Sequence, residues 1–148
     1  MALILVVDDE PAIRQLLCRW LAKEGHDTAE AEDAGAALDV MAATPAQVVF
    51  CDIRMPGRDG LWLTAELRER YPTTAIILAT GVSTVPAQTS LQAGVLAYLV
   101  KPFQRDNLRG ALNAALKWNA DAAMFGLRAD PGIDQVAGWL ESIDDVKP

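Results

Sequence analysis

Apolar residues along the chain are grouped in short runs of strand length, and each run stops abruptly at polar residues. The longest runs lie at residues 3–7, 47–51, 75–79 and 95–100. Their Val, Ile and Leu content without regular alternation is typical of parallel strands that are buried on both faces. A more polar run at residues 26–31 predicts a strand at the edge of the same sheet.

Segments with apolar residues three and four positions apart separate these runs and predict helices between the strands. Pro11 starts the first helix, which runs to Lys23, and Gly25 follows as its C-cap. Asp33 caps the second helix, which ends before Pro45. The remaining helices are predicted between a loop at residues 53–59 and Tyr71, at residues 83–93, and at residues 107–117 with room to continue to residue 123.

Strands that alternate with helices in this way indicate a doubly wound α/β fold. Right-handed crossovers and the flavodoxin-like strand order 2-1-3-4-5 give a five-stranded parallel sheet. We therefore expect one domain at residues 1–120 and a short C-terminal tail at residues 121–148, in which the amphipathic segment 133–143 predicts a short helix.

The overall composition fits a globular domain better than a disordered or membrane protein. The 148 residues are 51% hydrophobic, and no apolar run approaches the roughly 20 residues of a membrane span. A net charge of −7 argues against direct binding of nucleic acid or of an anionic membrane surface. No basic leader precedes the first strand, and Cys18 and Cys51 lie in apolar surroundings, so we expect a cytoplasmic protein with buried thiols.

Most of the predicted strands end at side chains that can do chemistry. Asp8 and Asp9 follow the first strand, Asp52 ends the third, Thr80 follows the fourth and Lys101 follows the fifth. Because the carboxyl ends of parallel strands meet at one edge of the sheet, these side chains should converge. Three carboxylates packed together repel one another unless a cation neutralises them, and Mg²⁺ prefers such oxygen ligands.

A carboxylate beside such an ion can attack phosphorus and form an acyl phosphate. Phosphoryl transfer depends mainly on positioning and charge neutralisation, which the ammonium of Lys101 and the hydroxyl of Thr80 could assist. The backbone carbonyl of Arg54 is a further candidate ligand for the ion. The chain contains neither of the glycine-rich nucleotide motifs G-x-x-x-x-G-K-[ST] and G-x-G-x-x-G. The residues thus predict a site that accepts a phosphoryl group on an aspartate.

In these motifs the chain resembles the receiver domain of response regulators, which act in two-component signalling. The resemblance covers residues 2–118 and includes the receiver form of the flavodoxin-like fold. It rests on four segments in a characteristic order and spacing: Val6-Val7-Asp8-Asp9-Glu10, the segment DIRMPGRDG at residues 52–60, Thr80-Gly81 and Lys101-Pro102-Phe103.

The resemblance implies a role for each acidic residue of the site. Asp52 is the phosphoacceptor and takes its phosphoryl group from a sensor histidine kinase or a histidine phosphotransfer protein. Asp9 binds Mg²⁺ directly, Asp8 binds it largely through water, and Arg54 contributes its backbone carbonyl. Such a receiver is a signalling module rather than an enzyme, although it assists its own phosphorylation and dephosphorylation.

The resemblance also implies how the signal would be passed on. Thr80 and Lys101 contact the phosphoryl group, and the Lys101-Pro102 peptide bond is typically cis in the family. Movement of Thr80 toward the phosphate lets Tyr98 turn inward. This movement changes the face made by the fourth helix, the fifth strand and the fifth helix, which a downstream protein reads. The same face could pair two copies of the chain in a homodimer.

Three other functions remain open at this stage. A haloacid-dehalogenase-like phosphatase has the same nucleophile and metal, but it carries D-x-D-x-[TV] after its first strand, where this chain has Asp8-Asp9-Glu10-Pro11. A flavodoxin-like redox carrier would need a phosphate loop rich in Ser, Thr and Gly after that strand. A phosphorylation-independent adaptor would not need the candidate residues Asp8, Asp9, Asp52, Thr80 and Lys101, all of which are present.

Overall fold

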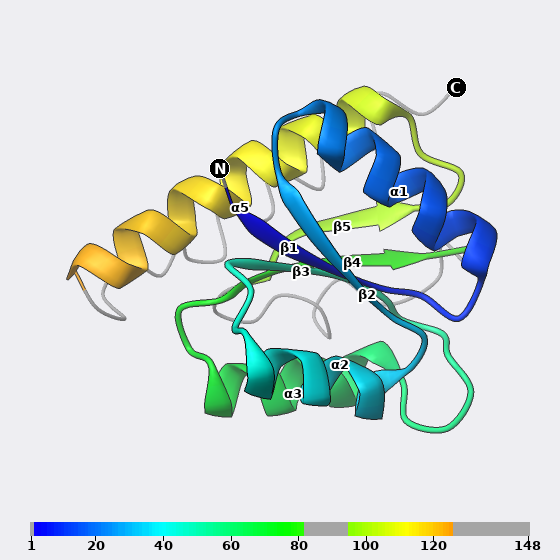
Figure 1. The fold of residues 1–148 in the computed structure, drawn as a ribbon, viewed down its shortest axis with the longest axis horizontal. Helices are drawn as coiled ribbons and strands as arrows, with labels where there is room; N and C mark the ends of the chain where they lie inside the picture. The colour runs from blue at the N-terminus through cyan, green and yellow to red at the C-terminus, as the bar shows by residue number, and fades with distance from the viewer. Residues whose placement is uncertain (1, 82–94, 126–148) are drawn as a thin grey trace.

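The computed structural model of the protein describes residues 2–81 and 95–125. They form a five-stranded parallel sheet with the order β2-β1-β3-β4-β5 and helices on both faces (Figure 1). The strands are β1 (Leu3–Val7), β2 (Asp27–Ala31), β3 (Val48–Asp52), β4 (Ala75–Thr80) and β5 (Val95–Val100). The helices are α1 (Pro11–Lys23), α2 (Ala34–Ala43), α3 (Gly60–Arg70) and α5 (Arg105–Phe125). The predicted fold class and strand order are confirmed.

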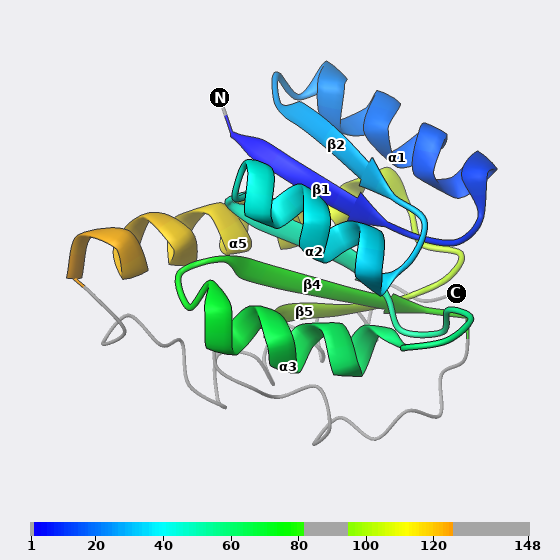
Figure 2. The same ribbon diagram turned by 60° about the horizontal axis from the view of Figure 1, so that its bottom comes forward.

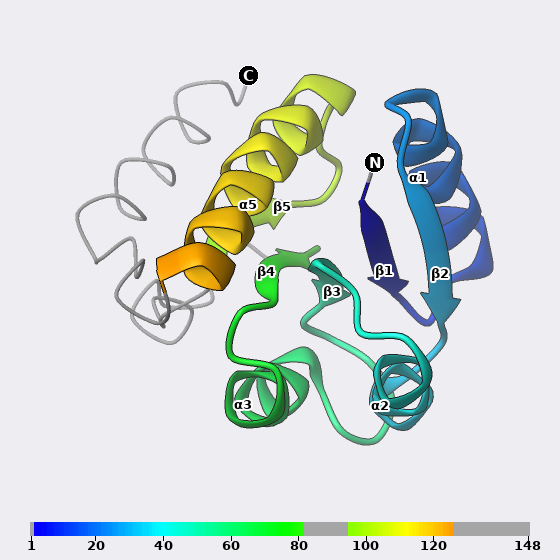
Figure 3. The same cartoon turned by 60° about the vertical axis from the view of Figure 1, so that its left-hand side comes forward.

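The sheet separates two hydrophobic cores. Successive side chains of a strand point to opposite faces, so Phe50 of β3 belongs to one core and Val49 to the other. Helices α1 and α5 cover the first face, and α2 and α3 cover the second (Figure 2 and Figure 3). Every residue of β3 is buried. Burial on both faces is the physical reason for the unbroken apolar runs in the sequence.

The edge strand β2 is more polar than its neighbours, as predicted. It pairs with β1, and of its five residues only Ala31 is buried. The strand begins at Asp27, one position after the predicted start at His26. Among the two cysteines, Cys51 is buried and Cys18 is partly exposed, and both are free thiols. Within residues 2–81 and 95–125, none of the helices has the length and apolar character that crossing a membrane requires.

Local side chains decide where the first three helices begin. Pro11 starts α1, where the missing N–H of proline costs no hydrogen bond. Asp33 and Asp59 cap α2 and α3, because each carboxylate accepts a hydrogen bond of 2.8 Å from the backbone N–H three residues later. At the far end of α1, Gly25 takes a positive φ of 87°, which favours glycine after a helix.

Helix α5 begins earlier than the predicted start at Asn107. The Asn107 side chain accepts a hydrogen bond of 2.9 Å from the Gln104 N–H, and the Asn107 N–H donates to the Gln104 carbonyl at 3.1 Å. The bond from the Gln104 N–H to the Asn107 side chain is one half of a capping box, and the first helical residue is Arg105.

Helix α5 also continues past Lys117, as the sequence allowed, and ends at Phe125, two residues beyond the predicted limit at residue 123. Trp118 and Ala122 extend the row of buried side chains that begins at Leu108, so packing against the sheet supports the extra turns. The domain boundary expected at residue 120 stays a prediction. The predicted helices at residues 83–93 and 133–143 lie outside the described residues.

The start of α3 passes very close to the end of β3, and this contact requires glycine at position 60. The Gly60 N–H donates to the Ile53 carbonyl at 2.8 Å. A Cβ atom at Gly60 would lie 2.8 Å from the Ile53 Cα and closer still to the Asp52 carbonyl oxygen. Both neighbours are backbone atoms, so no side-chain rotation could relieve the overlap. The contact holds the end of β3, with Asp52, against α3.

We therefore expect Gly60→Ala to lower the free energy of unfolding by about 3 kcal/mol, near the upper end of the usual cost of overpacking. The matched control is Gly35→Ala in α2, whose added Cβ would lie at an ordinary 3.6 Å from Asp33 Oδ1. Alanine should stabilise that helix by about 0.5 kcal/mol or more. Urea unfolding followed by circular dichroism measures both variants, and equal stabilities would contradict this account of Gly60.

Candidate functional site

Three charged side chains meet at the carboxyl ends of β1, β3 and β5. The Lys101 Nζ atom lies 2.6 Å from Asp8 Oδ2 and 3.3 Å from Asp52 Oδ2. Asp8 is 0% exposed and Asp52 is 4% exposed, so two buried carboxylates share one ammonium group. The Lys101-Pro102 peptide bond is cis, as the resemblance implied. The structure thus brings together three of the side chains that the strand order predicted to converge.

Backbone hydrogen bonds hold the two buried carboxylates in place. Asp8 Oδ1 accepts a bond of 2.9 Å from the Glu10 N–H, and the Asp8 N–H donates to the Ala31 carbonyl at 3.1 Å. Asp52 Oδ1 accepts a bond of 3.3 Å from the Arg54 N–H. In each carboxylate, one oxygen is therefore bound by the backbone while the other faces Lys101.

Burial controls the proton affinity of the site. Removal from water raises the pKa of Asp52 above its ordinary value; the charge of Lys101 lowers it, and the charge of Asp8 raises it again. Removal from water also favours loss of the proton from Lys101. Hydrogen bonds and charges from Asp8 and Asp52 outweigh that effect, so the pKa of Lys101 is raised. Lys101 stays charged, while the ionised Asp52 is held at a cost in free energy.

Asp9 and Glu10 are exposed beside this buried group. One carboxylate oxygen from each of Asp8, Asp9 and Glu10 can be chosen so that all three lie within 4.8 Å of one another. Carboxylate oxygens suit a hard divalent cation such as Mg²⁺, which usually keeps several of its own waters. The donor set therefore fits the ion that the resemblance implied. Glu10 was not singled out from the sequence, although its place directly after Asp8-Asp9 was a usable signal.

The remaining predicted residues lie at the same edge of the sheet or near it. Arg54 is exposed in the loop after β3. The backbone of Thr80 ends β4 opposite Val100, while its hydroxyl lies outside the described part of the structure. Tyr98 in β5 is 8% exposed and packs in the core on the α2 and α3 side of the sheet, and burial raises its pKa. The switch roles of Thr80 and Tyr98 stay predictions.

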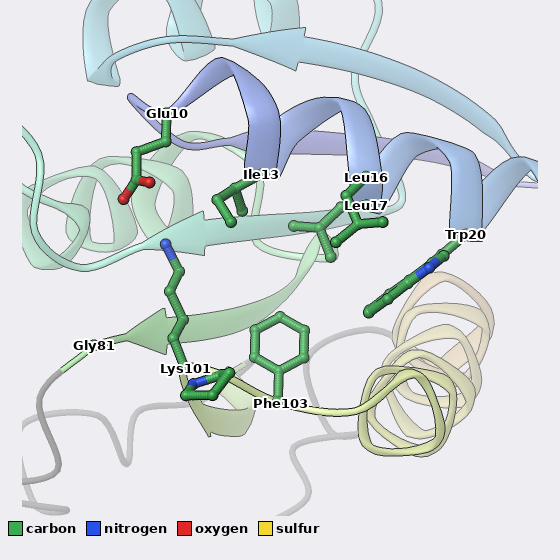
Figure 4. Close-up of a pocket in the computed structure, with 9 residues that line it drawn as sticks. Glu10, Ile13, Leu16, Leu17, Trp20, Gly81, Lys101 and Phe103 are labelled. Carbon is green, nitrogen blue, oxygen red and sulfur yellow. The ribbon is translucent and has the colours of Figure 1, made fainter.

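A cavity of about 380 Å³ opens beside Lys101, between α1 and the segment that follows β5 (Figure 4). The carboxylate of Glu10 and the ammonium of Lys101 lie at one end, and Trp20 lies at the other. The lining is mostly apolar and includes Ile13, Leu16, Leu17 and Phe103. The helical pattern of α1 assigned Ile13, Leu16 and Leu17 to the core, so the sequence did not reveal the cavity.

Comparison with known proteins points in the same direction as the geometry. The family model described as the response regulator receiver domain matches residues 4–113. The transcriptional regulatory protein AruR of Pseudomonas aeruginosa is 34% identical over an alignment of 146 residues, and the match covers 95% of this chain and 60% of AruR. The DNA-binding transcriptional regulator NtrC of Escherichia coli is 36% identical over 115 residues, which are 77% of this chain and 24% of NtrC. The chain spans less than two thirds of the length of these relatives.

Solved structures with the same fold are also similar in sequence. The response regulator protein TrrA from Thermotoga maritima, in complex with Mg²⁺-BeF, is 37% identical with a TM-score of 0.72. The match covers 78% of this chain and 100% of TrrA. The receiver domain of NtrX from Brucella abortus is 35% identical with a TM-score of 0.70, and the match covers 77% of this chain and 98% of that domain.

The raised pKa of Asp52 predicts that its charge destabilises the metal-free fold. We expect Asp52→Asn to raise the free energy of unfolding at pH 7 by on the order of 1 kcal/mol, the usual scale of single substitutions. The folded protein binds the Asp52 proton more tightly than the unfolded chain does. The stability linked to that proton is therefore complete below the ordinary aspartate pKa of about 3.9 and is lost as the pH rises through the higher folded value.

Urea unfolding in EDTA at a series of pH values from about pH 4 upward tests this expectation. The stability gained by Asp52→Asn should grow as the pH rises. Asp39→Asn, at an exposed position of α2, is the control and should behave like the unsubstituted protein. A constant difference between Asp52→Asn and the unsubstituted protein at every pH would contradict the assignment.

Proposed function

Because the chain belongs to the response regulator receiver domain family, we propose that it is a signalling switch in which Asp52 accepts a phosphoryl group. The family consists of signalling modules rather than classical enzymes. The observation that carries the proposal is the placement of Asp52 at the carboxyl end of β3, 4% exposed, with the Lys101 ammonium 3.3 Å away. The geometry supports this function better than a phosphatase, a redox carrier or a phosphorylation-independent adaptor.

In the proposed reaction, a carboxylate oxygen of Asp52 attacks the phosphorus of a phosphohistidine on a partner protein. One P–O bond forms, one P–N bond breaks, and the imidazole leaves. Lys101 faces Asp52 Oδ2 and is held there by its 2.6 Å contact with Asp8, and these contacts support a role for its ammonium in pairing with the phosphoryl oxygens. Water molecules would have to reorganise to stabilise the negative charge of the phosphoryl group, whereas the Lys101 ammonium already lies beside Asp52.

The acidic residues beside Asp52 would hold Mg²⁺. In this proposal Asp9 and Asp52 bind the ion through carboxylate oxygens, Asp8 acts largely through water, and Arg54 gives its backbone carbonyl. The bound ion would neutralise negative charge on the transferred phosphoryl group. The clustered carboxylates of Asp8, Asp9 and Glu10 support the proposal, because such a group is better stabilised by a divalent cation than by Lys101 alone.

The output of the switch would start at β4 and β5. In the proposal the Thr80 hydroxyl donates to a phosphoryl oxygen, and Tyr98 then moves inward. The two residues lie on paired strands, since Thr80 is opposite Val100 and Tyr98 is opposite Leu78. Such a rearrangement would change the face that the sequence analysis assigns to the predicted helix at residues 83–93, β5 and α5.

The proposed partners are proteins. A sensor histidine kinase or a histidine phosphotransfer protein would supply the phosphoryl group, and the apolar cavity beside Lys101 offers such a donor a contact surface. A downstream protein, or a second copy of this chain, would bind the changed surface. The net charge of −7 supports protein partners over direct binding of nucleic acid or membrane by this chain, and the proposed location is the cytoplasm.

Acetyl phosphate tests the phosphoacceptor directly. With Mg²⁺ present, intact-mass spectrometry should detect one added phosphoryl group, which is labile at alkaline pH as an acyl phosphate is. The adduct should be absent in Asp52→Asn and in the presence of EDTA, and Asp39→Asn should label normally. An unsubstituted protein that never labels would falsify the proposal, and repeated turnover of a phosphomonoester would favour a phosphatase.

A further inference from the structure

The Arg14 side chain joins helix α1 to strand β2 and to the residue that follows β1. Its Nη1 donates to the backbone carbonyl oxygen of Asp8 at 2.6 Å, and its Nε donates to Glu30 Oε1 at 3.2 Å. The side chain is 15% exposed, compared with 45% for Glu30. A planar guanidinium donates in fixed directions, so binding at two nitrogens determines its orientation more firmly than a single ammonium contact could.

The carbonyl group that Arg14 binds belongs to the peptide unit between Asp8 and Asp9. This unit is planar and rigid, so fixing its oxygen also fixes the direction in which the Asp9 N–H and Cα leave β1. The Asp8 carboxylate has separate contacts, with the Glu10 N–H and with Lys101. The guanidinium therefore adds little to the placement of that carboxylate, and its main effect falls on the exposed residue that follows.

We infer that Arg14 is a positioning residue, which holds the Asp8–Asp9 peptide in the orientation that lets Asp9 bind the divalent cation. The inference rests on the magnesium site of the proposed function. Ion affinity depends strongly on groups that orient the ligands without touching the metal, and their loss typically weakens binding by about 10- to 100-fold.

The direction in which Mg²⁺ affinity changes when Arg14 is replaced shows whether the side chain acts by positioning Asp9 or through its own charge. If Arg14 acted only through its positive charge, its removal would relieve repulsion of Mg²⁺ and strengthen binding. If it positions Asp9, its removal weakens binding even though a repelling charge has been lost. A merely structural contact would instead lower the free energy of unfolding and leave the dissociation constant of Mg²⁺ unchanged.

The experiment titrates metal-free protein with MgCl₂ and follows the backbone amide signals of Asp9 and Glu10 by NMR. Arg14→Met should raise the dissociation constant by about 10-fold. Arg14→Lys keeps the positive charge but lacks the planar guanidinium group, and it should also bind Mg²⁺ more weakly than the unsubstituted protein. Arg19→Met makes the same charge change at an exposed position of α1 and should stay within about twofold of the unsubstituted value.

Two further measurements complete the test. In metal-free protein, the Asp9 and Glu10 amides should exchange with solvent faster in Arg14→Met than in Arg19→Met. Urea unfolding reports how much of the effect is stability, and Arg14→Lys carries the test if Arg14→Met does not fold. Mg²⁺ binding by the Arg14 variants that is equal to or tighter than normal overturns the inference, whereas no binding by the unsubstituted protein contradicts the proposed magnesium site itself.

Discussion

The ammonium of Lys101 between the carboxylates of Asp8 and Asp52 is the interaction on which the site depends. Two buried carboxylates at one edge of a sheet repel each other, and water is largely absent to screen them. The two carboxylates and the ammonium can meet only if β1, β3 and β5 end side by side at the same edge of the sheet. The register of the parallel strands aligns these ends, with Val7 of β1 opposite Cys51 of β3. The apolar strands thus position charges that the apolar core itself could not hold.

The strands could be predicted from the sequence because burial on both faces demands an apolar side chain at nearly every position. The polar edge strand carries a weaker pattern, and its start was misplaced by one residue. Helix ends were predictable where one side chain decides them, as with Pro11 and Asp33. The start of α5 depends instead on the Asn107 side chain, which accepts a hydrogen bond from the Gln104 N–H, and the apolar periodicity does not reveal this contact.

The same distinction holds in the candidate site. Asp8, Asp52 and Lys101 could be predicted because each follows or ends a buried strand, and topology alone then brings them together. Arg14 could not, since its contact joins a helix side chain to a backbone carbonyl whose direction no residue pattern records. Sequence therefore predicts which side chains converge at the site better than it predicts which groups fix the backbone around them.

The lysine contacts also bear on how the chain folds. Lys101 is 93 residues from Asp8 and 49 residues from Asp52 along the chain. Closing such long loops is entropically expensive and normally follows the formation of local structure. During synthesis, Asp8 after β1 and Asp52 at the end of β3 emerge well before Lys101, which follows β5 and supplies their countercharge. Assembly of the charged site should accordingly coincide with the last strand joining the sheet, so a correctly formed site reports that the sheet is complete.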